Sequence, residues 1–135
     1  VIVVHVDSTK PISPSCFGAG WRVGVDECYR DSLLGAIGEL DGVAFGTVVI
    51  CDAVVSLAGP IGIYQPGLHI VSPVGAAVRC EAWSVQGSPQ ACIGVYADGV
   101  LLHNLTFADM TRPEETVSGV NARRRARSLL YFDEE

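Results

Sequence analysis

The chain has 135 residues, of which 49% are hydrophobic and only 18% are charged, and its formal net charge is −6. This length predicts one domain, and no apolar run approaches the ~18 residues that a bilayer-crossing helix needs, so we expect no membrane span. Residues 1–111 carry four basic against ten acidic side chains. This acidic body excludes nucleic acid as its main ligand, because attraction to phosphate dominates that affinity.

The N-terminal part of the chain contains one predicted strand and one predicted helix. Residues 1–6 are mostly β-branched, which predicts a strand, and prolines and glycines interrupt residues 8–24, which predicts a loop. Asp31 or Ser32 is placed to cap a short helix over residues 33–40, where apolar side chains recur at spacings of three and four.

A turn glycine followed by a short apolar strand occurs three times. The glycines are Gly46, Gly67 and Gly99, so they stand 21 and 32 residues apart. Self-similarity at such a spacing is typical of solenoids, whose coils bury their apolar faces against the next coil. The strands predicted in this region cover residues 47–51, 54–57, 61–64, 68–72, 77–83, 91–96 and 100–107.

Several of these strands are nearly continuous apolar runs, as expected for parallel strands that are covered on both faces. No helical segment between them is long enough to be the crossover of a βαβ unit. The coil itself would then connect the parallel strands, which predicts an all-β fold, a parallel β-helix.

Three segments resemble the coils of right-handed parallel β-helix proteins of the pectin-lyase-like superfamily. They are Gly46-Thr47-Val48-Val49-Ile50-Cys51, the stretch from Gly62 to Pro73, and the stretch from Ala97 to Phe107; the stretch from Tyr29 to Leu40 resembles the helix that caps the first coil. The resemblance covers residues 29–109. It implies a short right-handed solenoid with a capping helix, and not an activity, because the superfamily includes lyases, hydrolases, phage tailspikes, adhesins and non-catalytic binding domains. About three or four coils fit here, and the last one would need a cap or a partner.

The five cysteines form no C-x-x-C pair and no regular framework. Cys51, Cys80 and Cys92 lie in apolar, strand-like contexts, where free cysteine behaves as a small hydrophobe. We therefore favour buried thiols over disulfides, and the odd number leaves at least one cysteine without a partner in the chain.

The acidic residues are spread along the chain. Relatives that cleave polyuronides use clustered acids beside an arginine or lysine, for calcium binding or for general acid–base catalysis. Here Asp52, Asp98 and Asp109 are separate and flank turns or strand ends, which favours turn capping. If the chain were an enzyme, these three acids and Arg79 would be the candidates for catalysis. We predict instead that the chain has no catalytic residue.

The histidines and one asparagine receive structural interpretations. His5, His69 and His103 lack i,i+2 or i,i+4 partners, so we predict no metal site and no cofactor, although stacking on adjacent coils would allow metal binding. Asn104 begins an N-x-T sequon. We expect its amide instead to bond the backbone of the neighbouring coil at a bend.

The C-terminal segment differs from the body. Its arginines could form a solvated charge run, a contact to nucleic acid or acidic protein, or a processing site. We favour a docking segment, in which apolar and aromatic side chains enter a partner's groove and arginines line the rim. The predicted partner-binding residues are Arg123, Arg124, Arg125, Arg127, Leu129, Leu130, Tyr131 and Phe132.

These observations predict a non-catalytic structural or interaction subunit of a larger assembly, which binds neighbouring protein subunits through its open coil end and its C-terminal tail. Nucleic acid would be a partner only through the arginines. The alternatives are a carbohydrate-binding or polysaccharide-cleaving protein of the pectin-lyase-like kind, present as a processed piece because the chain begins at Val1, and a virion or phage fibre component.

The predicted organisation has three parts. Residues 1–28 form an N-terminal strand and loop, residues 29–109 form the β-helix with its capping helix, and residues 110–135 form the docking tail.

Overall fold

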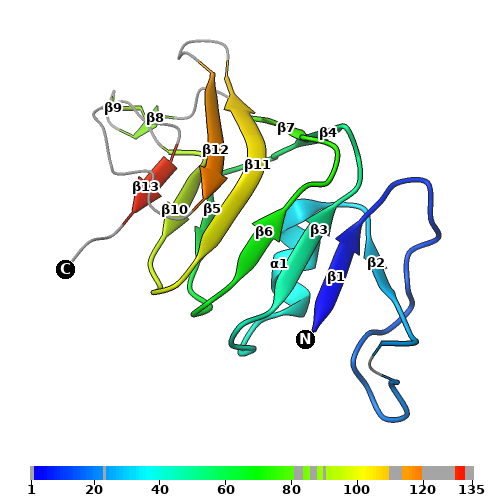
Figure 1. The fold of residues 1–135 in the computed structure, drawn as a ribbon. Coiled ribbons are helices and arrows are strands. Elements are labelled where there is room, and N and C mark those ends of the chain that lie inside the picture. Colours follow the sequence, from blue (N-terminus) through cyan, green and yellow to red (C-terminus); the bar gives the residue numbers. More distant parts are fainter. Residues whose placement is uncertain are drawn as a thin grey trace.

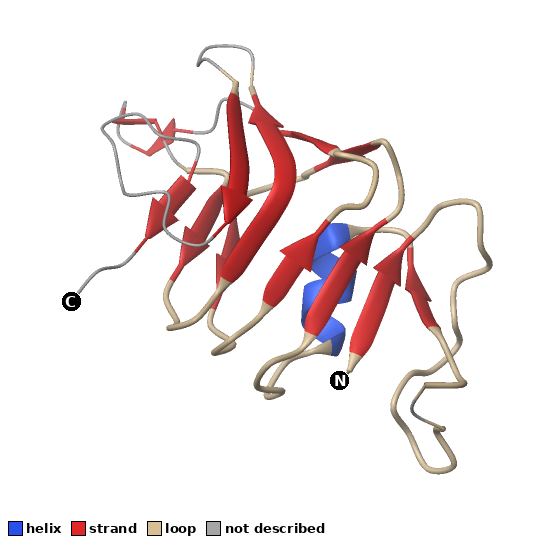
Figure 2. Cartoon of the chain, in the orientation of Figure 1, coloured by secondary structure: helices blue, strands red, loops and turns tan. Residues whose placement is uncertain are grey.

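The computed structural model describes residues 2–22, 24–80, 84–85, 88–89, 91–109, 114–119 and 130–132. It contains one helix among short strands (Figure 2). The elements are β1 (Val3–Val6), β2 (Cys28–Arg30), α1 (Leu33–Glu39), β3 (Thr47–Ile50), β4 (Val54–Ser56), β5 (Ile61–Ile63), β6 (His69–Val71), β7 (Ala77–Arg79), β8 (Ser84–Val85), β9 (Ser88–Pro89), β10 (Ile93–Val95), β11 (Leu101–Ala108), β12 (Glu115–Gly119) and β13 (Leu130–Phe132).

Most strands belong to one eight-stranded sheet in the order β2-β1-β3-β6-β11-β7-β4, with β12 paired to β11. Every pairing in it is parallel except that of β11 with β12. Strands β1, β3, β6 and β11 lie side by side and point the same way, as Figure 1 shows. The parallel arrangement expected from the apolar runs is therefore confirmed.

The three glycine-led segments form neighbouring strands. Thr47 of β3 is in register with His69 of β6, which is in register with Leu101 of β11. Two residues earlier, Phe45, Gly67 and Gly99 all have a positive φ, of 61°, 70° and 74°. A residue with left-handed backbone thus precedes each strand; at Gly67 and Gly99 glycine accepts that backbone without the steric cost of a Cβ, whereas before β3 Phe45, and not Gly46, occupies the position.

A second, three-stranded parallel sheet has the order β13-β10-β5, and β8 and β9 form a separate antiparallel pair. Strands β5, β10 and β13 are grouped at the C-terminal side of the molecule (Figure 1). A strand is present within each of the ranges predicted between residues 47 and 107, with ends that shift by a few residues, and positions 81–83 of the predicted strand 77–83 lie outside the described residues. The short strands β2, β8, β9, β12 and β13 were not predicted.

The short helix is confirmed, and Ser32 is its N-cap. The Ser32 hydroxyl accepts a hydrogen bond from the Gly35 amide at 3.0 Å, which satisfies one of the amides that a first helical turn leaves unpaired. Leu33, Ala36 and Ile37 are buried. The helix packs on β1, β2 and β3.

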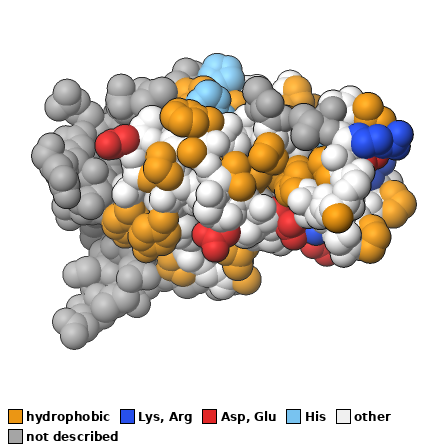
Figure 3. Space-filling view, turned by 90° about the horizontal axis from the view of Figure 1, so that it is seen from below, with side chains coloured by type: hydrophobic (Ala, Val, Ile, Leu, Met, Phe, Trp, Pro, Cys, Tyr) orange, Lys and Arg blue, Asp and Glu red, His pale blue; other side chains and the backbone are white. Residues whose placement is uncertain are grey.

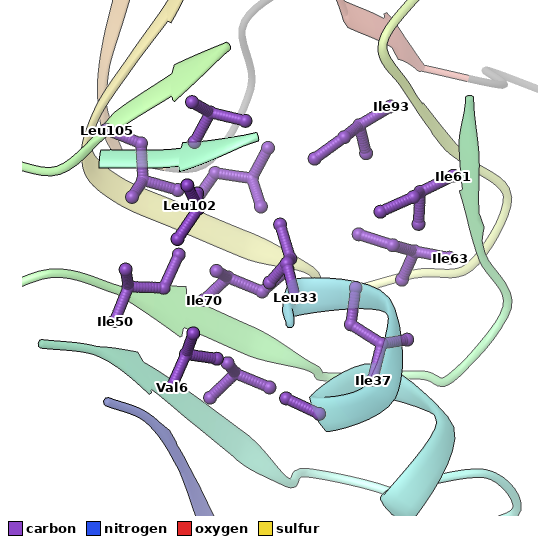
Figure 4. Packing of buried hydrophobic residues seen from close by; sticks show 14 of the residues in the cluster. Val6, Leu33, Ile37, Ile50, Ile61, Ile63, Ile70, Ile93, Leu102 and Leu105 are labelled. Atoms are coloured by element: carbon purple, nitrogen blue, oxygen red, sulfur yellow. The ribbon is translucent and has the colours of Figure 1, made fainter. Parts of the chain in front are cut away.

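The core lies between the large sheet on one side and α1 with the second sheet on the other. Figure 4 shows Leu33 and Ile37 of α1 near Ile70, with Ile61 and Ile93 on the far side of the same cluster. All five side chains are at most 4% exposed. Burying aliphatic side chains of this size stabilises a fold by about 1.5–3 kcal/mol each.

The predicted all-β solenoid is wrong: the structure is a mostly parallel sheet with one short helix. β11 is a single eight-residue strand that pairs with β6 through its first half, with β7 through its second half, and with antiparallel β12. β11 therefore joins β6 and β7 into one sheet, whereas the predicted solenoid would place them on separate faces of its coils. The buried face of α1 makes the helix part of the core, and its predicted role as a cap has only weak support.

The expectation of buried thiols is wrong for four of the five cysteines. Cys16 bonds to Cys28 with a Cα–Cα distance of 5.7 Å, and Cys80 bonds to Cys92 with a Cα–Cα distance of 5.9 Å. Cys51 is the free cysteine, as the odd number required. The apolar context of the cysteines did not reveal the disulfide pairs, because each pair depends on which two segments the fold brings together.

Candidate functional site

The candidate binding site begins with two matching strands of the second sheet. β5 and β10 are in register, so that Gly62 stands beside Gly94. Side chains alternate along a strand. The isoleucines Ile61 and Ile93 enter the core, and the glycines therefore face outward.

Two tyrosines follow these glycines on the same outer face. The rings of Tyr64 and Tyr96 stack with centroids 5.0 Å apart and an interplanar angle of 11°. They are 69% and 46% exposed, which is unusual for such large side chains in a pair.

The glycines leave the space that the rings occupy. A Cβ at Gly62 would lie 2.7 Å from Cε2 of Tyr64, and a Cβ at Gly94 would lie 2.8 Å from Cε2 of Tyr96. Each ring therefore folds back over the glycine of its own strand, and its hydroxyl lies above bare backbone. Any side chain at these two positions would displace a ring.

A hollow of about 350 Å³ opens beside the rings. This volume falls in the range of small-molecule sites, which is about 300–1,000 Å³. No charged residue lines it among the described residues, and its polar groups are the phenol hydroxyls and the strand backbone. We call it the tyrosine hollow; its lining residues are Pro60, Ile61, Gly62, Tyr64, Ala91, Gly94 and Tyr96.

Sequence reasoning missed this site, although a signal was present. Ile61-Gly62-Ile63-Tyr64 is repeated as Ile93-Gly94-Val95-Tyr96, at the same 32-residue distance that separates Gly67 from Gly99. Alternation within each copy already places glycine and tyrosine on one face. Pairing the two copies would have brought the tyrosines together.

The predicted tail residues lie only partly within the described chain. Arg123, Arg124, Arg125, Arg127 and Leu129 fall outside the described residues. Leu130 is 1% exposed at the start of β13, which pairs with β10. The backbones of Tyr131 and Phe132 continue that pairing, with Tyr131 in register with Gly94. Their role in binding a partner stays a prediction.

The candidate acids do not form one group. Asp52, after the C-terminal end of β3, accepts hydrogen bonds from the Ser8 amide at 2.9 Å and from the Ser8 hydroxyl at 3.0 Å. Asp98 lies in the turn before β11, where its carbonyl accepts a bond from the Gly67 amide. Since β3 and β11 run parallel on either side of β6, Asp52 after β3 and Asp98 before β11 lie at opposite ends of these strands.

The other two candidates, Arg79 and Asp109, lie at the C-terminal ends of the neighbouring strands β7 and β11. Arg79 ends β7 and is in register with Ala108, and Asp109 directly follows Ala108. Arg79 is exposed. Neither residue lines the tyrosine hollow.

The histidines lie on three strands of the large sheet without forming a cluster. His69 and His103 are on neighbouring strands, but His103 is in register with Val71, so the two are two positions apart. His5 contacts Tyr29, with ring centroids 5.3 Å apart and ring planes inclined by 31°.

One group of metal-ligand side chains occurs in the described part of the chain. Ligand atoms of Cys16, Cys28 and Glu39 lie within 4.8 Å of one another. Both sulfurs belong to a disulfide, so neither is a thiolate that could bind a metal.

The free cysteine is not an activated nucleophile. Burial raises the pKa of the Cys51 thiol, and the carboxylates of Asp7 and Asp52 raise it further. The thiolate is the reactive form. A raised pKa therefore keeps Cys51 in its unreactive form at neutral pH.

The structural interpretation of Asn104 is confirmed. Its side-chain amide donates a hydrogen bond of 2.7 Å to the carbonyl of Ser72, in the turn after β6. Its φ is +58°, and the register of β11 with β12 shifts between His103 and Leu105. Asn104 thus marks a bend in β11.

Comparison with known proteins gives no relatives: no protein-family model, curated protein or solved structure matches the chain. The resemblance to pectin-lyase-like proteins therefore gains no support. Among the described residues, α1 is far too short to cross a bilayer, and no other helix is present that could do so.

Proposed function

We propose that this protein binds a neutral carbohydrate in the tyrosine hollow and does not cleave it. The observation that carries the proposal is the stacked, exposed pair of Tyr64 and Tyr96 above two glycines in register. This site is built of aromatic rings and bare backbone.

The lining selects the ligand by its chemistry. Because no charged residue lines the hollow in the described chain, a charged ligand would lose hydration without gaining an ionic partner. An aromatic ring offers an apolar face, and its phenol adds a polar group at the edge. A pyranose ring complements both, since its C–H face is apolar and its rim carries hydroxyls.

The edge position of β5 supports stacking by a sugar. β5 ends the second sheet, whose order is β13-β10-β5. One face of the Tyr64 ring contacts Tyr96, and the Tyr64 side chain is still 69% exposed. A sugar ring placed on the other face of the Tyr64 ring would extend the stack by one layer.

The positions of the acids support binding without hydrolysis. Glycosidases use two carboxyl groups that are about 5–10 Å apart on either side of the bond to be cleaved. No carboxylate lines the tyrosine hollow in the described chain, and Asp52 and Asp98 lie at opposite ends of the parallel strands β3 and β11.

Calorimetric titration with sugars of matched length tests the proposal. We expect binding of a neutral hexasaccharide, either cellohexaose or xylohexaose, and no binding of hexagalacturonate. Tyr64→Ala should weaken binding at least tenfold, because exposed aromatic side chains dominate such contacts. Tyr64→Phe should keep most of it.

Val74→Ala is the matched control, since Val74 is also exposed, at 58%, and does not line the hollow. Failure of both neutral sugars to bind, or equal affinity of wild type and Tyr64→Ala, would contradict the proposal. Release of reducing ends from the bound sugar would contradict its non-catalytic part.

A second candidate is the interaction subunit predicted from the sequence. Among the described residues, eight large hydrophobic side chains are 44–73% exposed, and Figure 3 shows apolar groups across the face seen from below. Such surface is often covered by a partner. Light scattering of the purified full chain tests this candidate, and a stable monomer whose C-terminal amides resist hydrogen exchange would argue against it.

A further inference from the structure

A second hollow lies far from the tyrosines, between β1 and the long loop that precedes β2. It has a volume of about 240 Å³. The loop is visible between β1 and β2 in Figure 2. We call this second cavity the loop hollow. The lining residues used in the argument are Val3, His5, Phe17, Trp21, Asp26 and Glu27.

Aromatic rings form one wall of the loop hollow. Phe17 and Trp21 meet edge to face, with centroids 4.9 Å apart and planes inclined by 60°. His5 lines it from β1 and is held by its contact with Tyr29. Trp and Phe faces carry the negative part of the ring quadrupole, which attracts cations.

Two carboxylates border the same space, and only one has a cationic partner in the described chain. Asp26 pairs with Arg22 at 3.2 Å and accepts the Arg22 amide at 2.8 Å. Glu27 accepts a hydrogen bond from the Tyr29 hydroxyl. That bond raises the pKa of Tyr29 to about 12, so the tyrosine stays a neutral hydrogen-bond donor.

The loop is fixed before any ligand arrives. The Cys16–Cys28 disulfide closes it beside Phe17. The Tyr29 amide donates to the Ser13 hydroxyl at 3.0 Å, and the Ser13 amide donates to the Tyr29 carbonyl at 3.2 Å. A site held in its binding geometry loses less conformational entropy when a ligand binds.

We propose that the loop hollow binds a small organic cation, such as a quaternary ammonium group, between the aromatic wall and the carboxylate of Glu27. The wall supplies cation–π attraction, and Glu27 supplies a charge that no residue of the described chain neutralises. A compact cation fits the volume and would form an ionic contact with Glu27, whereas a neutral ligand of the same shape would form none. The site is independent of the tyrosine hollow.

The test compares two ligands of the same shape. Choline and 3,3-dimethylbutan-1-ol differ by one positive charge, because a quaternary carbon replaces the nitrogen. In ligand-observed NMR titrations of the full oxidised chain, we expect saturable choline binding that is at least tenfold tighter than that of the alcohol. Equal affinity for the two, or binding of neither, would overturn the proposal.

Variants test the contribution of the Glu27 charge separately from that of the aromatic wall. Glu27→Gln keeps an acceptor for Tyr29 but removes the charge, and we expect it to weaken choline binding about tenfold and to leave the alcohol unchanged. Asp41→Asn is the matched control, because it removes one exposed charge that does not line the loop hollow. Equal choline affinity in Glu27→Gln and wild type would overturn the role of the carboxylate.

Phe17→Leu keeps an apolar side chain but removes the ring, and we expect it to weaken choline binding. Its thermal unfolding, measured in parallel, shows whether the loop is still folded. A folded Phe17→Leu protein with unchanged choline affinity would overturn the aromatic part of the proposal.

Discussion

Asn104 joins a backbone requirement to a side-chain bond. Its positive φ is tolerated by asparagine better than by most residues, and its amide reaches the Ser72 carbonyl. Ser72 is itself buried, donates to the Ile50 carbonyl at 2.9 Å and accepts the Ala76 amide at 2.9 Å. The bend of β11 is thus tied to the turn that follows β6.

Two substitutions at this position should separate the two contributions. Asn104→Gly keeps the backbone conformation and loses the hydrogen bond, and we expect it to lower the free energy of unfolding by about 1 kcal/mol. Asn104→Ala loses the bond and also puts alanine, which tolerates the left-handed region less well than asparagine, at this positive φ, and we expect a total loss of about 2 kcal/mol. Urea unfolding measures both values. Equal losses would show that backbone conformation does not matter here.

At the residue level, the sequence predicts what depends on one residue and its neighbours. The role of Asn104 followed from its place at a bend, and the Ser32 cap followed from its place before an apolar pattern. The stacking of Tyr64 on Tyr96 did not, because it requires knowing that β5 and β10 pair. The disulfide partners required the same knowledge.

Helix α1 shows how two glycines in one element can have opposite roles. A Cβ at Gly35 would lie 2.9 Å from the hydroxyl oxygen of Ser32, which caps the helix. A Cβ at Gly38 would meet no atom within 4 Å. Gly35 therefore makes room for the cap, whereas Gly38 only adds freedom to the unfolded chain.

Alanine substitutions at these positions should change stability in opposite directions. We expect Gly38→Ala to raise the free energy of unfolding by about 0.5–1 kcal/mol, because alanine favours helix over glycine. Gly35→Ala should displace the Ser32 cap and lower the free energy of unfolding by about 1 kcal/mol. Thermal and urea unfolding measure both. A similar gain in the two variants would contradict the steric role of Gly35.

Elements were predictable where the local pattern is strong. The strands β3 to β7, β10 and β11 and the helix α1 follow from apolar periodicity and turn glycines. β2 was divided between the N-terminal loop and the stretch that resembles a capping helix, and β13 was expected to be part of a docking tail. Both have three residues and exist because they pair with β1 and β10, so their formation depends on contacts distant in sequence.

At the scale of the whole molecule, the repeated strands did not determine how the remaining strands are arranged in the sheet. The glycine-led repeats specified a turn and a parallel neighbour, and both are present in β3, β6 and β11. A solenoid would also require the remaining strands to stack as separate faces. The eight residues of β11 prevent this, because they connect β6 to β7 within one sheet.

The two disulfides are typical of proteins that fold in an oxidising environment, since such bonds are rare where thiols are kept reduced. Each joins cysteines 12 residues apart. Closing loops of this size stabilises a protein by about 3 kcal/mol, chiefly by restricting the unfolded chain. We therefore expect reduction to lower the unfolding midpoint in urea substantially.

Counting thiols tests the whole covalent arrangement at once. In denaturant without reductant, one thiol per chain should react with Ellman's reagent, and after reduction five should react. In the folded protein at pH 8, Cys51 should react more slowly than a cysteine peptide, because its raised pKa leaves less thiolate at that pH. Its rate should rise as the pH approaches that pKa. Three or five reactive thiols before reduction would mean that one or both disulfides are absent, and the closed loop beside Phe17 would then lose its main constraint.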